Sequence, residues 1–156
     1  MNAPTNPKEL ELQTVEFKLD GKTIVSYEGE TILKAAKRHG IDIPHLCFKD
    51  GYRPDGNCRA CVVEINGERT LAPSCCRSAT PGMEVKANSE RAIKSQKLVL
   101  EMLLSDMPDE GFKWVGDTKE EEQKNQHGEL STWAARMDVT VRPELKALRR
   151  EKVNSD

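Results

Sequence analysis

The sequence predicts an α+β fold in which a small mixed sheet packs against a helix. Two observations predict it: apolar alternations are interrupted by Asp20-Gly21 and by Asn66-Gly67, and residues 31–39 and 89–105 have helical periodicity. Asp-Gly and Asn-Gly favour the tight turns of β-hairpins. The order of hairpin, helix, loop, hairpin, strand and helix therefore indicates strands and helices that share one core.

The first predicted hairpin pairs residues 14–19 with residues 22–26. One face of its first strand carries the alternating apolar residues Val15, Phe17 and Leu19. A helix is predicted over residues 31–39, because Thr31 can cap its first turn and Gly40 can adopt the left-handed conformation that ends a helix. The apolar face of this helix comprises Ile32, Ala35, Ala36 and His39.

The second half of the predicted sheet follows a cysteine-rich loop. Residues 62–65 and 68–71 flank the Asn66-Gly67 turn, and residues 83–85 form a short further strand. A second helix is predicted from Ser89, a favourable cap, to about residue 105. Its expected apolar stripe comprises Ile93, Leu100, Leu103, Leu104 and Met107, and Pro108 ends it.

The two ends of the chain carry few apolar residues. Residues 1–13 are expected to form a flexible arm, and residues 109–156 a charged connector with short helices from Ser131 and Pro143. This connector is expected to bury too little apolar surface to offset its conformational entropy, so it would lead to, or dock on, further domains. Its two tryptophans, Trp114 and Trp133, are either packing residues or anchors for a partner.

Composition argues against several classes of function. Charged residues make up 32% of the 156 residues and aromatic residues 4%, and the formal net charge of -2 predicts no nucleic-acid partner. No apolar run approaches the roughly 18 residues of a membrane span, and the N-terminus does not resemble a signal peptide. We therefore expect a soluble, cytoplasmic protein without a membrane partner. The chain shows no phosphate loop and no nucleophile–base arrangement, so no catalytic residue or substrate site is assigned to it.

Four of the five cysteines have the spacing C-x10-C-x2-C-x13-C, namely Cys47, Cys58, Cys61 and Cys75. Thiolates are soft ligands that suit an iron–sulfur cluster or zinc. Disulfides are disfavoured, because cytosolic thiols stay reduced and the cysteine count is odd. Zinc sites usually present two close pairs, whereas one close pair flanked by two distant cysteines favours a binuclear cluster. Zinc and unliganded thiols remain alternatives.

Other residues near these cysteines have simpler interpretations. Cys76 is expected to be a small buried or half-exposed residue, and His45 a loop residue that caps a carbonyl. Arg59 and Arg77 are solvated side chains, docking charges, or charges that raise a cluster's potential. Three small residues would let backbone N–H groups approach sulfur: Gly51, Gly56 and Ala60.

Residues from about Val15 to Met107 resemble the 2Fe-2S ferredoxin domain that opens the large iron–sulfur subunit of complex I, the iron-only hydrogenases and the NAD-dependent formate dehydrogenases. The matching motifs are IPHLC, GNCRACVVEI, the PSC that precedes Arg77, PGM-V, and the NSE that opens a helix ending in MLL. The resemblance implies a β-grasp 2Fe-2S ferredoxin-like domain over residues 14–108. It also implies that the cluster ligands are Cys47, Cys58, Cys61 and Cys75.

One departure from this resemblance is informative. In complex I and the hydrogenases, a His and three Cys after the MLL helix bind a 4Fe-4S cluster, whereas no cysteine follows Cys76 here. The segment DEGFKW and its charged continuation look more like the formate dehydrogenase alpha subunit. That resemblance implies 4Fe-4S clusters, molybdopterin with molybdenum or tungsten, FMN and NAD elsewhere in the complex, and a partner subunit that binds flavin and NAD.

The sequence thus supports two classes of function. The first is electron transfer through a 2Fe-2S cluster within a formate dehydrogenase or a related multi-cluster oxidoreductase. The second is a free-standing module, either a ferredoxin-type carrier or a zinc-binding adaptor. The charged extension and the near-neutral net charge favour the first class, because a free carrier is expected to be compact with an acidic docking face.

Overall fold

The computed structural model of the chain describes residues 13–107 and 128–148. The strands are β1 (Thr14–Leu19), β2 (Lys22–Tyr27), β3 (Val62–Ile65), β4 (Ala72–Pro73) and β5 (Glu84–Lys86). The helices are α1 (Ile32–Arg38), α2 (Glu90–Ser105), α4 (Glu129–Arg136) and α5 (Pro143–Ala147). Most of the expected N-terminal arm, the first part of the expected connector with Trp114, and the last eight residues lie outside the described residues.

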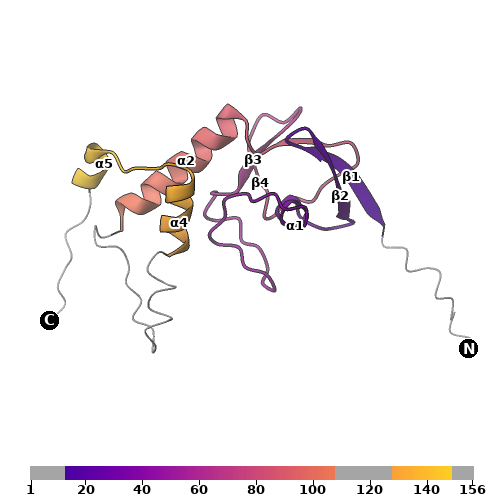
Figure 1. The fold of residues 1–156 in the computed structure, drawn as a ribbon, viewed down its shortest axis with the longest axis horizontal. Coiled ribbons are helices and arrows are strands. Elements are labelled where there is room, and N and C mark those ends of the chain that lie inside the picture. Colours follow the sequence, from indigo (N-terminus) through magenta and orange to yellow (C-terminus); the bar gives the residue numbers. More distant parts are fainter. Residues whose placement is uncertain (1–12, 108–127, 149–156) are drawn as a thin grey trace, which may run out of the picture.

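The strands form one mixed sheet with the order β2-β1-β5-β3-β4. β1 pairs antiparallel with β2 and parallel with β5, and β3 pairs antiparallel with both β5 and β4. Figure 1 shows α1 beside the sheet, and α2 extending from the sheet towards α4 and α5. This mixed sheet with its helices agrees with the expected β-grasp ferredoxin-like fold.

The predicted caps set the starts of the two main helices. Thr31 Oγ1 accepts a hydrogen bond from the backbone N–H of Lys34 at 3.3 Å, and Ser89 Oγ accepts one from Ala92 at 3.2 Å. Each cap satisfies a backbone donor that has no partner within the helix. The first hairpin was also predicted correctly, since the turn at Asp20-Gly21 joins β1 and β2.

The second hairpin differs from the prediction. Its return strand is β4, at residues 72–73, whereas the sequence pattern predicts it at residues 68–71. The physical reason lies at Ser74, whose backbone N–H and Oγ both donate to the carbonyl oxygen of Cys61, at 3.2 and 2.7 Å. These bonds fix the register in which Val62 lies opposite Pro73. The connection between the two strands is therefore longer than the two-residue Asn-Gly turn.

The buried face of α2 also differs from the predicted stripe. Leu100 is buried as expected, but Leu103 is 39% exposed, and the inward residues include Ala92 and the polar Gln96. Gln96 Nε2 donates to the carbonyl oxygens of Val62 at 2.8 Å and of Ala87 at 3.2 Å. A buried amide with two acceptors avoids the cost of an unsatisfied donor. The helix is therefore rotated relative to the prediction made from apolar residues alone.

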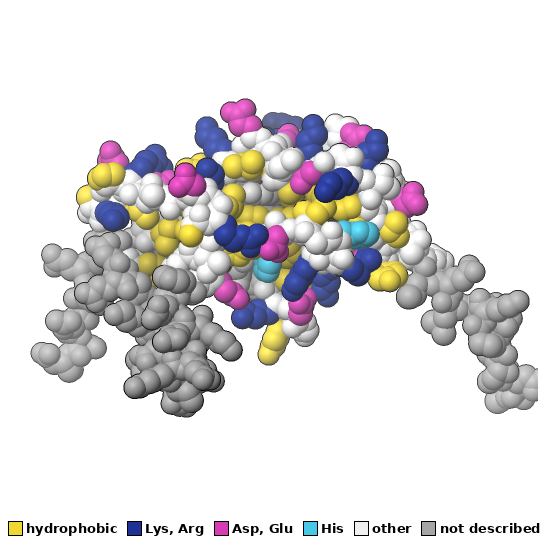
Figure 2. Space-filling model, viewed as in Figure 1, with side chains coloured by type: hydrophobic (Ala, Val, Ile, Leu, Met, Phe, Trp, Pro, Cys, Tyr) yellow, Lys and Arg dark blue, Asp and Glu magenta, His cyan; other side chains and the backbone are white. Residues whose placement is uncertain are grey.

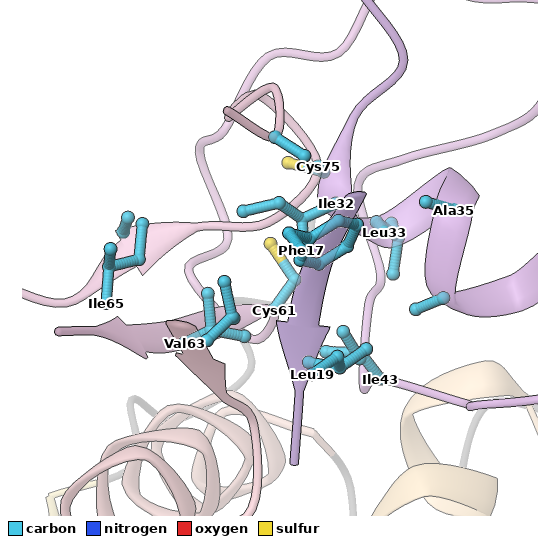
Figure 3. Packing of buried hydrophobic residues seen from close by; sticks show 14 of the residues in the cluster. Phe17, Leu19, Ile32, Leu33, Ala35, Ile43, Cys61, Val63, Ile65 and Cys75 are labelled. Carbon is cyan, nitrogen blue, oxygen red and sulfur yellow. The ribbon is translucent and has the colours of Figure 1, made fainter. Parts of the chain in front are cut away.

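The buried apolar residues form two clusters. The sheet core comprises Phe17, Leu19, Ile24, Ile32, Leu33, Ala35, Ala36, Ile43, Phe48, Cys61, Val63, Ile65, Ala72, Cys75, Ala79, Met83 and Val85. The helix cluster comprises Ala60, Leu100 and Trp133, with Leu46, Cys58, Val99, Leu130, Met137 and Val139 packed against them. Figure 3 shows part of the sheet core.

For residues 128–148, the helix cluster corrects the expectation that the connector buries little apolar surface. Trp133 is only 8% exposed and Ala134 only 5%, because α4 packs on α2. The short helix predicted from Ser131 begins two residues earlier, at Glu129, and the helix predicted from Pro143 begins at that proline. Residues 128–148 therefore pack against the ferredoxin-like part of the chain.

The surface is mixed in character. Figure 2 shows Lys and Arg side chains interspersed with Asp and Glu side chains on one face, with hydrophobic side chains between them. This pattern agrees with the near-neutral net charge of the sequence. In the part of the chain that the structure describes, none of the helices combines the length and the hydropathy that a membrane crossing requires.

Candidate cysteine site

Two of the predicted ligands, Cys61 and Cys75, are placed by the pairing of β3 with β4. Cys61 immediately precedes β3, Cys75 is the second residue after β4, and both are 1% exposed. The hydrogen bonds from Ser74 to the Cys61 carbonyl hold the two segments together. Figure 3 shows both sulfur atoms near Phe17 and Ile32, among the residues of the sheet core.

The start of α1 supports the turn that carries Cys75. The backbone N–H of Leu33 donates to the carbonyl oxygen of Ser74 at 3.0 Å, and that of Ile32 donates to Arg77 at 2.8 Å. These N–H groups belong to the first helical turn, which lacks partners within the helix. The turn around Cys75 is thus fixed from two sides, by β3 and by the N-terminus of α1.

Cys58 lies in the loop before β3, where the backbone adopts unusual conformations. Gly56 is buried with φ +66, and Arg59, between the two close cysteines, has φ +60. Only glycine adopts the left-handed region without a steric penalty. Ala60 is completely buried, and Cys58 packs against the helix cluster. The small residues singled out in the sequence therefore shape a tight loop.

Cys47 lies between residues that belong to different clusters. Leu46 packs against the helix cluster, and Phe48 is part of the sheet core. Cys47 itself is half-buried. His45 was expected to cap a carbonyl group, and this is confirmed, because its ring Nδ1 lies 2.8 Å from the carbonyl oxygen of Ile43.

The thiols that the structure brings together influence one another. Burial, together with the neighbouring Cys61 and Cys76 thiols, raises the pKa of the Cys75 thiol well above its ordinary value. Binding to a metal would therefore have to displace this proton, as it does for any thiol ligand. Among residues 13–107 and 128–148, no three His, Cys, Asp or Glu side chains are grouped so as to hold a single metal ion.

Cys76 is exposed, and its sulfur contacts the loop that carries Cys58. Its Sγ lies 3.6 Å from the Sγ of Cys75, and a Cβ at Gly56 would lie only 2.9 Å from it. The absence of a side chain at Gly56 therefore lets the loop approach the turn around Cys75. This close approach fits a set of thiol donors that must converge from two segments of chain, as binding of an iron–sulfur cluster requires.

Two flanking arginines and one tryptophan complete the surroundings of the cysteines. Arg77 forms an ion pair with Glu68, and Arg59 is exposed. From the sequence, Trp133 was either a packing residue or an anchor for a partner. In the structure it packs beside the cysteine loop. Its indole lies 5.9 Å from the His45 ring, between ring centroids. The only signal in the sequence was a tryptophan in an otherwise polar segment.

Comparison with known proteins identifies the family of the segment that carries the cysteines. The family model described as "2Fe-2S iron-sulfur cluster binding domain" matches residues 13–90. The NADP-reducing hydrogenase subunit HndD of Solidesulfovibrio fructosivorans is 50% identical over 95 aligned residues, in a match that covers 58% of this chain and 16% of that protein. The mitochondrial NADH-ubiquinone oxidoreductase 78 kDa subunit of Candida albicans is 37% identical over 97 residues, which are 62% of this chain and 14% of that protein.

A solved structure extends the similarity. A chain in the crystal structure of an NAD+-reducing NiFe-hydrogenase in the H2-reduced state matches with a TM-score of 0.66 and 32% identity. The match covers 81% of this chain and 50% of that chain. The present chain thus spans half or less of the length of these relatives. Since the family model covers half of its residues, the chain belongs to the family of 2Fe-2S iron–sulfur cluster binding domains.

Proposed function

We propose that this chain transfers electrons through a 2Fe-2S cluster held by Cys47, Cys58, Cys61 and Cys75. A bound cluster supplies one-electron redox chemistry, and the protein supplies the position of the cluster and its potential. The observation that carries the proposal is the family match over residues 13–90, which contain all four cysteines. If the cluster resembles those of plant-type ferredoxins, its potential lies near about −400 mV.

The arrangement of the four thiols supports this ligand set over one that includes Cys76. Cys61 and Cys75 are neighbouring buried members of the sheet core, whereas Cys76 is exposed. Cys58 lies on a loop that approaches this turn at Gly56. The Cys76 sulfur lies 3.6 Å from the Cys75 sulfur and close to Gly56, so what distinguishes Cys76 from the proposed ligands is its greater exposure.

We further propose that the parent complex is an NAD-dependent formate dehydrogenase or a related NAD-linked oxidoreductase. The named relatives belong to a NADP-reducing hydrogenase, a NADH-ubiquinone oxidoreductase and a NAD+-reducing hydrogenase, and these names support an NAD-linked complex. The further clusters and the flavin- and NAD-binding partner of that complex are part of the proposal. The formate assignment rests on the resemblance of the segment DEGFKW and on residues 77–156, which contain no cysteine. Molybdopterin and further 4Fe-4S clusters would belong to other parts of that complex.

The ligand assignment is tested by reconstituting the 156-residue chain with iron and sulfide under argon. We expect two irons and two sulfides per chain, visible absorbance, and a 2Fe-2S electron paramagnetic resonance signal after reduction. Replacing Cys58 or Cys61 by Ser should abolish the signal, and Cys76→Ser, one position from a proposed ligand, is the matched control that should leave it unchanged. Colourless protein with one zinc, or a signal lost in Cys76→Ser and retained in Cys75→Ser, would overturn the assignment.

The identity of the electron donor requires the native complex, purified through a tag on this chain. Formate, hydrogen and NADH are added separately under anaerobic conditions, and the 2Fe-2S signal is followed. Reduction of the cluster by formate within the turnover time supports the formate dehydrogenase assignment. Reduction by hydrogen or NADH but not by formate would discard that assignment while leaving the electron-transfer function in place.

A further inference from the structure

Helix α4 lies along the segment that carries Cys47, and an ion pair joins the two near each end of the helix. Near its C-terminal end, Arg136 Nη1 lies 2.9 Å from Asp42 Oδ2. At its N-terminal end, Glu129 Oε1 lies 3.3 Å from Lys49 Nζ. The start of the cysteine segment therefore pairs with the end of the helix, and its end pairs with the start of the helix, so the two run antiparallel. Cys47 lies between the two paired positions in the sequence.

The centre of this contact is Trp133. Glu129, Trp133 and Arg136 are spaced by four and three residues, so they share one face of the helix. The indole faces the His45 ring at 5.9 Å between centroids, and the Arg136 guanidinium lies over it at 4.2 Å. Trp133 also belongs to the helix cluster, which contains Ala60 and contacts Cys58. One side chain thus touches the surroundings of two proposed ligands.

The segment after α4 is fastened to α2. Arg142 Nε and Nη2 donate to the Glu101 carboxylate at 2.8 and 3.3 Å, and the Arg142 backbone N–H donates to it at 3.0 Å. Three hydrogen bonds between one pair of oppositely charged residues give a well-defined geometry. Because α4 is attached to α2 as well as to residues 42–49, Trp133 is held against the cysteine loop.

We infer that α4 is a strap across the cluster-binding loop, and that Trp133 is a positioning residue that keeps water from the Cys58 side of the cluster. The inference rests on the proposed function. A 2Fe-2S cluster with four thiolates is anionic and gains a further negative charge on reduction, and an apolar, desolvated environment disfavours the more highly charged state. Solvent exposure is one of the variables that set cluster potentials. Trp133 therefore lowers the reduction potential and slows the loss of the cluster.

The test compares Trp133→Phe, Trp133→Leu and Trp133→Ala in the reconstituted 156-residue chain. We expect the potential measured by redox titration to become less negative in the order Phe, Leu, Ala, and the rate of cluster release to a chelator to rise in the same order. Should Trp133→Ala fail to retain a cluster, the Leu variant supplies the comparison. Leu148→Ala is the matched control, because Leu148 lies in the same tail and is 78% exposed, and it should change neither quantity.

Amide exchange of the apo-protein gives a readout that does not involve the cluster. Hydrogen-bonded amides of α4 and its C-terminal end, such as those of Thr132 and Met137, should exchange faster in Trp133→Ala than in the unchanged protein or in Leu148→Ala. Potentials that stay the same across the Trp133 series, while stability alone falls, would show that Trp133 is only a packing residue and would overturn the inference. Failure of the unchanged protein to assemble a 2Fe-2S cluster would instead reject the proposed function, so the two failures are distinguishable.

Discussion

The sheet core and the helix cluster support different halves of the proposed ligand set. Cys61 and Cys75 are members of the sheet core, whereas Cys58 packs against the helix cluster. Cys47 lies between Leu46 of the helix cluster and Phe48 of the sheet core. The sheet core is built from segments that are paired by backbone hydrogen bonds, while the helix cluster depends on side-chain contacts with α4. One half of the proposed ligand set is therefore supported by paired strands, and the other half by the packing of α4.

The largest effect is expected from a large-to-small change in the sheet core. Phe17 is 2% exposed, and replacing a buried phenylalanine by alanine typically costs about 3–5 kcal/mol of unfolding free energy. Phe17→Ala should lower the stability of the apo-protein by this amount in urea denaturation and abolish cluster binding. Tyr52→Ala, at a residue that is 75% exposed, is the control and should change stability by no more than about 0.5 kcal/mol. Equal losses in the two variants would contradict the assignment of the core.

A smaller and more local effect is expected in the helix cluster. Leu100 is completely buried, and Leu100→Ala should cost about 2–3 kcal/mol, the lower part of the usual range for a buried leucine, because this cluster is small. Amide exchange should increase in α4 and in the loop around Cys58 more than in β1 and β2. Leu98→Ala, on the same helix but 40% exposed, should leave the exchange pattern unchanged. Uniform loss of protection across the sheet would mean that the two clusters form one cooperative unit.

Gly56 tests how closely the two halves of the site approach each other. Gly56→Ala should cost about 1–2 kcal/mol, because alanine is strained at φ +66 and its Cβ would lie 2.9 Å from the Cys76 sulfur. Gly51→Ala isolates the backbone strain, since Gly51 has φ +87 but no atom within 4 Å of the added Cβ. When Cys76 is also replaced by Ala, the loss of unfolding free energy caused by Gly56→Ala should decrease towards the loss caused by Gly51→Ala. An unchanged cost in that background would show that the sulfur contact contributes nothing.

The smallest expected effect is a pH dependence of the stability contributed by the Glu101–Arg142 pair, which joins the segment after α4 to α2. Hydrogen bonds from the Arg142 side chain and backbone lower the pKa of Glu101 below its usual value. A carboxyl group with a lowered pKa in the folded state contributes stability that is complete above its unfolded pKa and is lost as the pH falls through the folded pKa. The stability difference between the unchanged protein and Glu101→Gln should thus be constant near neutral pH and shrink below about pH 4. Denaturation curves at several pH values measure it, and a difference that grows on acidification would refute this explanation.

Local signals in the sequence predicted the parts of the fold that depend on short-range interactions. Thr31 and Ser89 capped helices as predicted, and Asp20-Gly21 formed the first turn, because these effects involve residues three or four positions apart. The cysteine spacing also pointed to the segment that carries the candidate site. The assignment of its four ligands stays a prediction until the serine variants are measured.

Long-range contacts account for the differences. The register of β4 depends on Ser74 and Cys61, which lie 13 positions apart, and the inward turn of Gln96 depends on a carbonyl 34 positions away. Trp133 was ambiguous for the same reason, since its partners lie in α2 and in the cysteine loop. A polar residue with a buried hydrogen-bond partner, such as Gln96, is not part of a periodic apolar pattern in the sequence. The same holds for a single aromatic residue that packs in a cluster, such as Trp133.

The ion pair between Asp42 and Arg136 also has a consequence for the order of folding. The two residues are 94 positions apart, whereas β1 and β2 join neighbouring residues through a tight turn. The entropy cost of closing a loop increases with its length, and contacts between distant residues slow folding. We therefore expect the β1–β2 hairpin to form before α4 docks on residues 42–49. During that interval the loop with Cys47 and Cys58 is accessible, so iron and sulfide can enter before the strap covers it, and a chain that docks α4 too early would be harder to load.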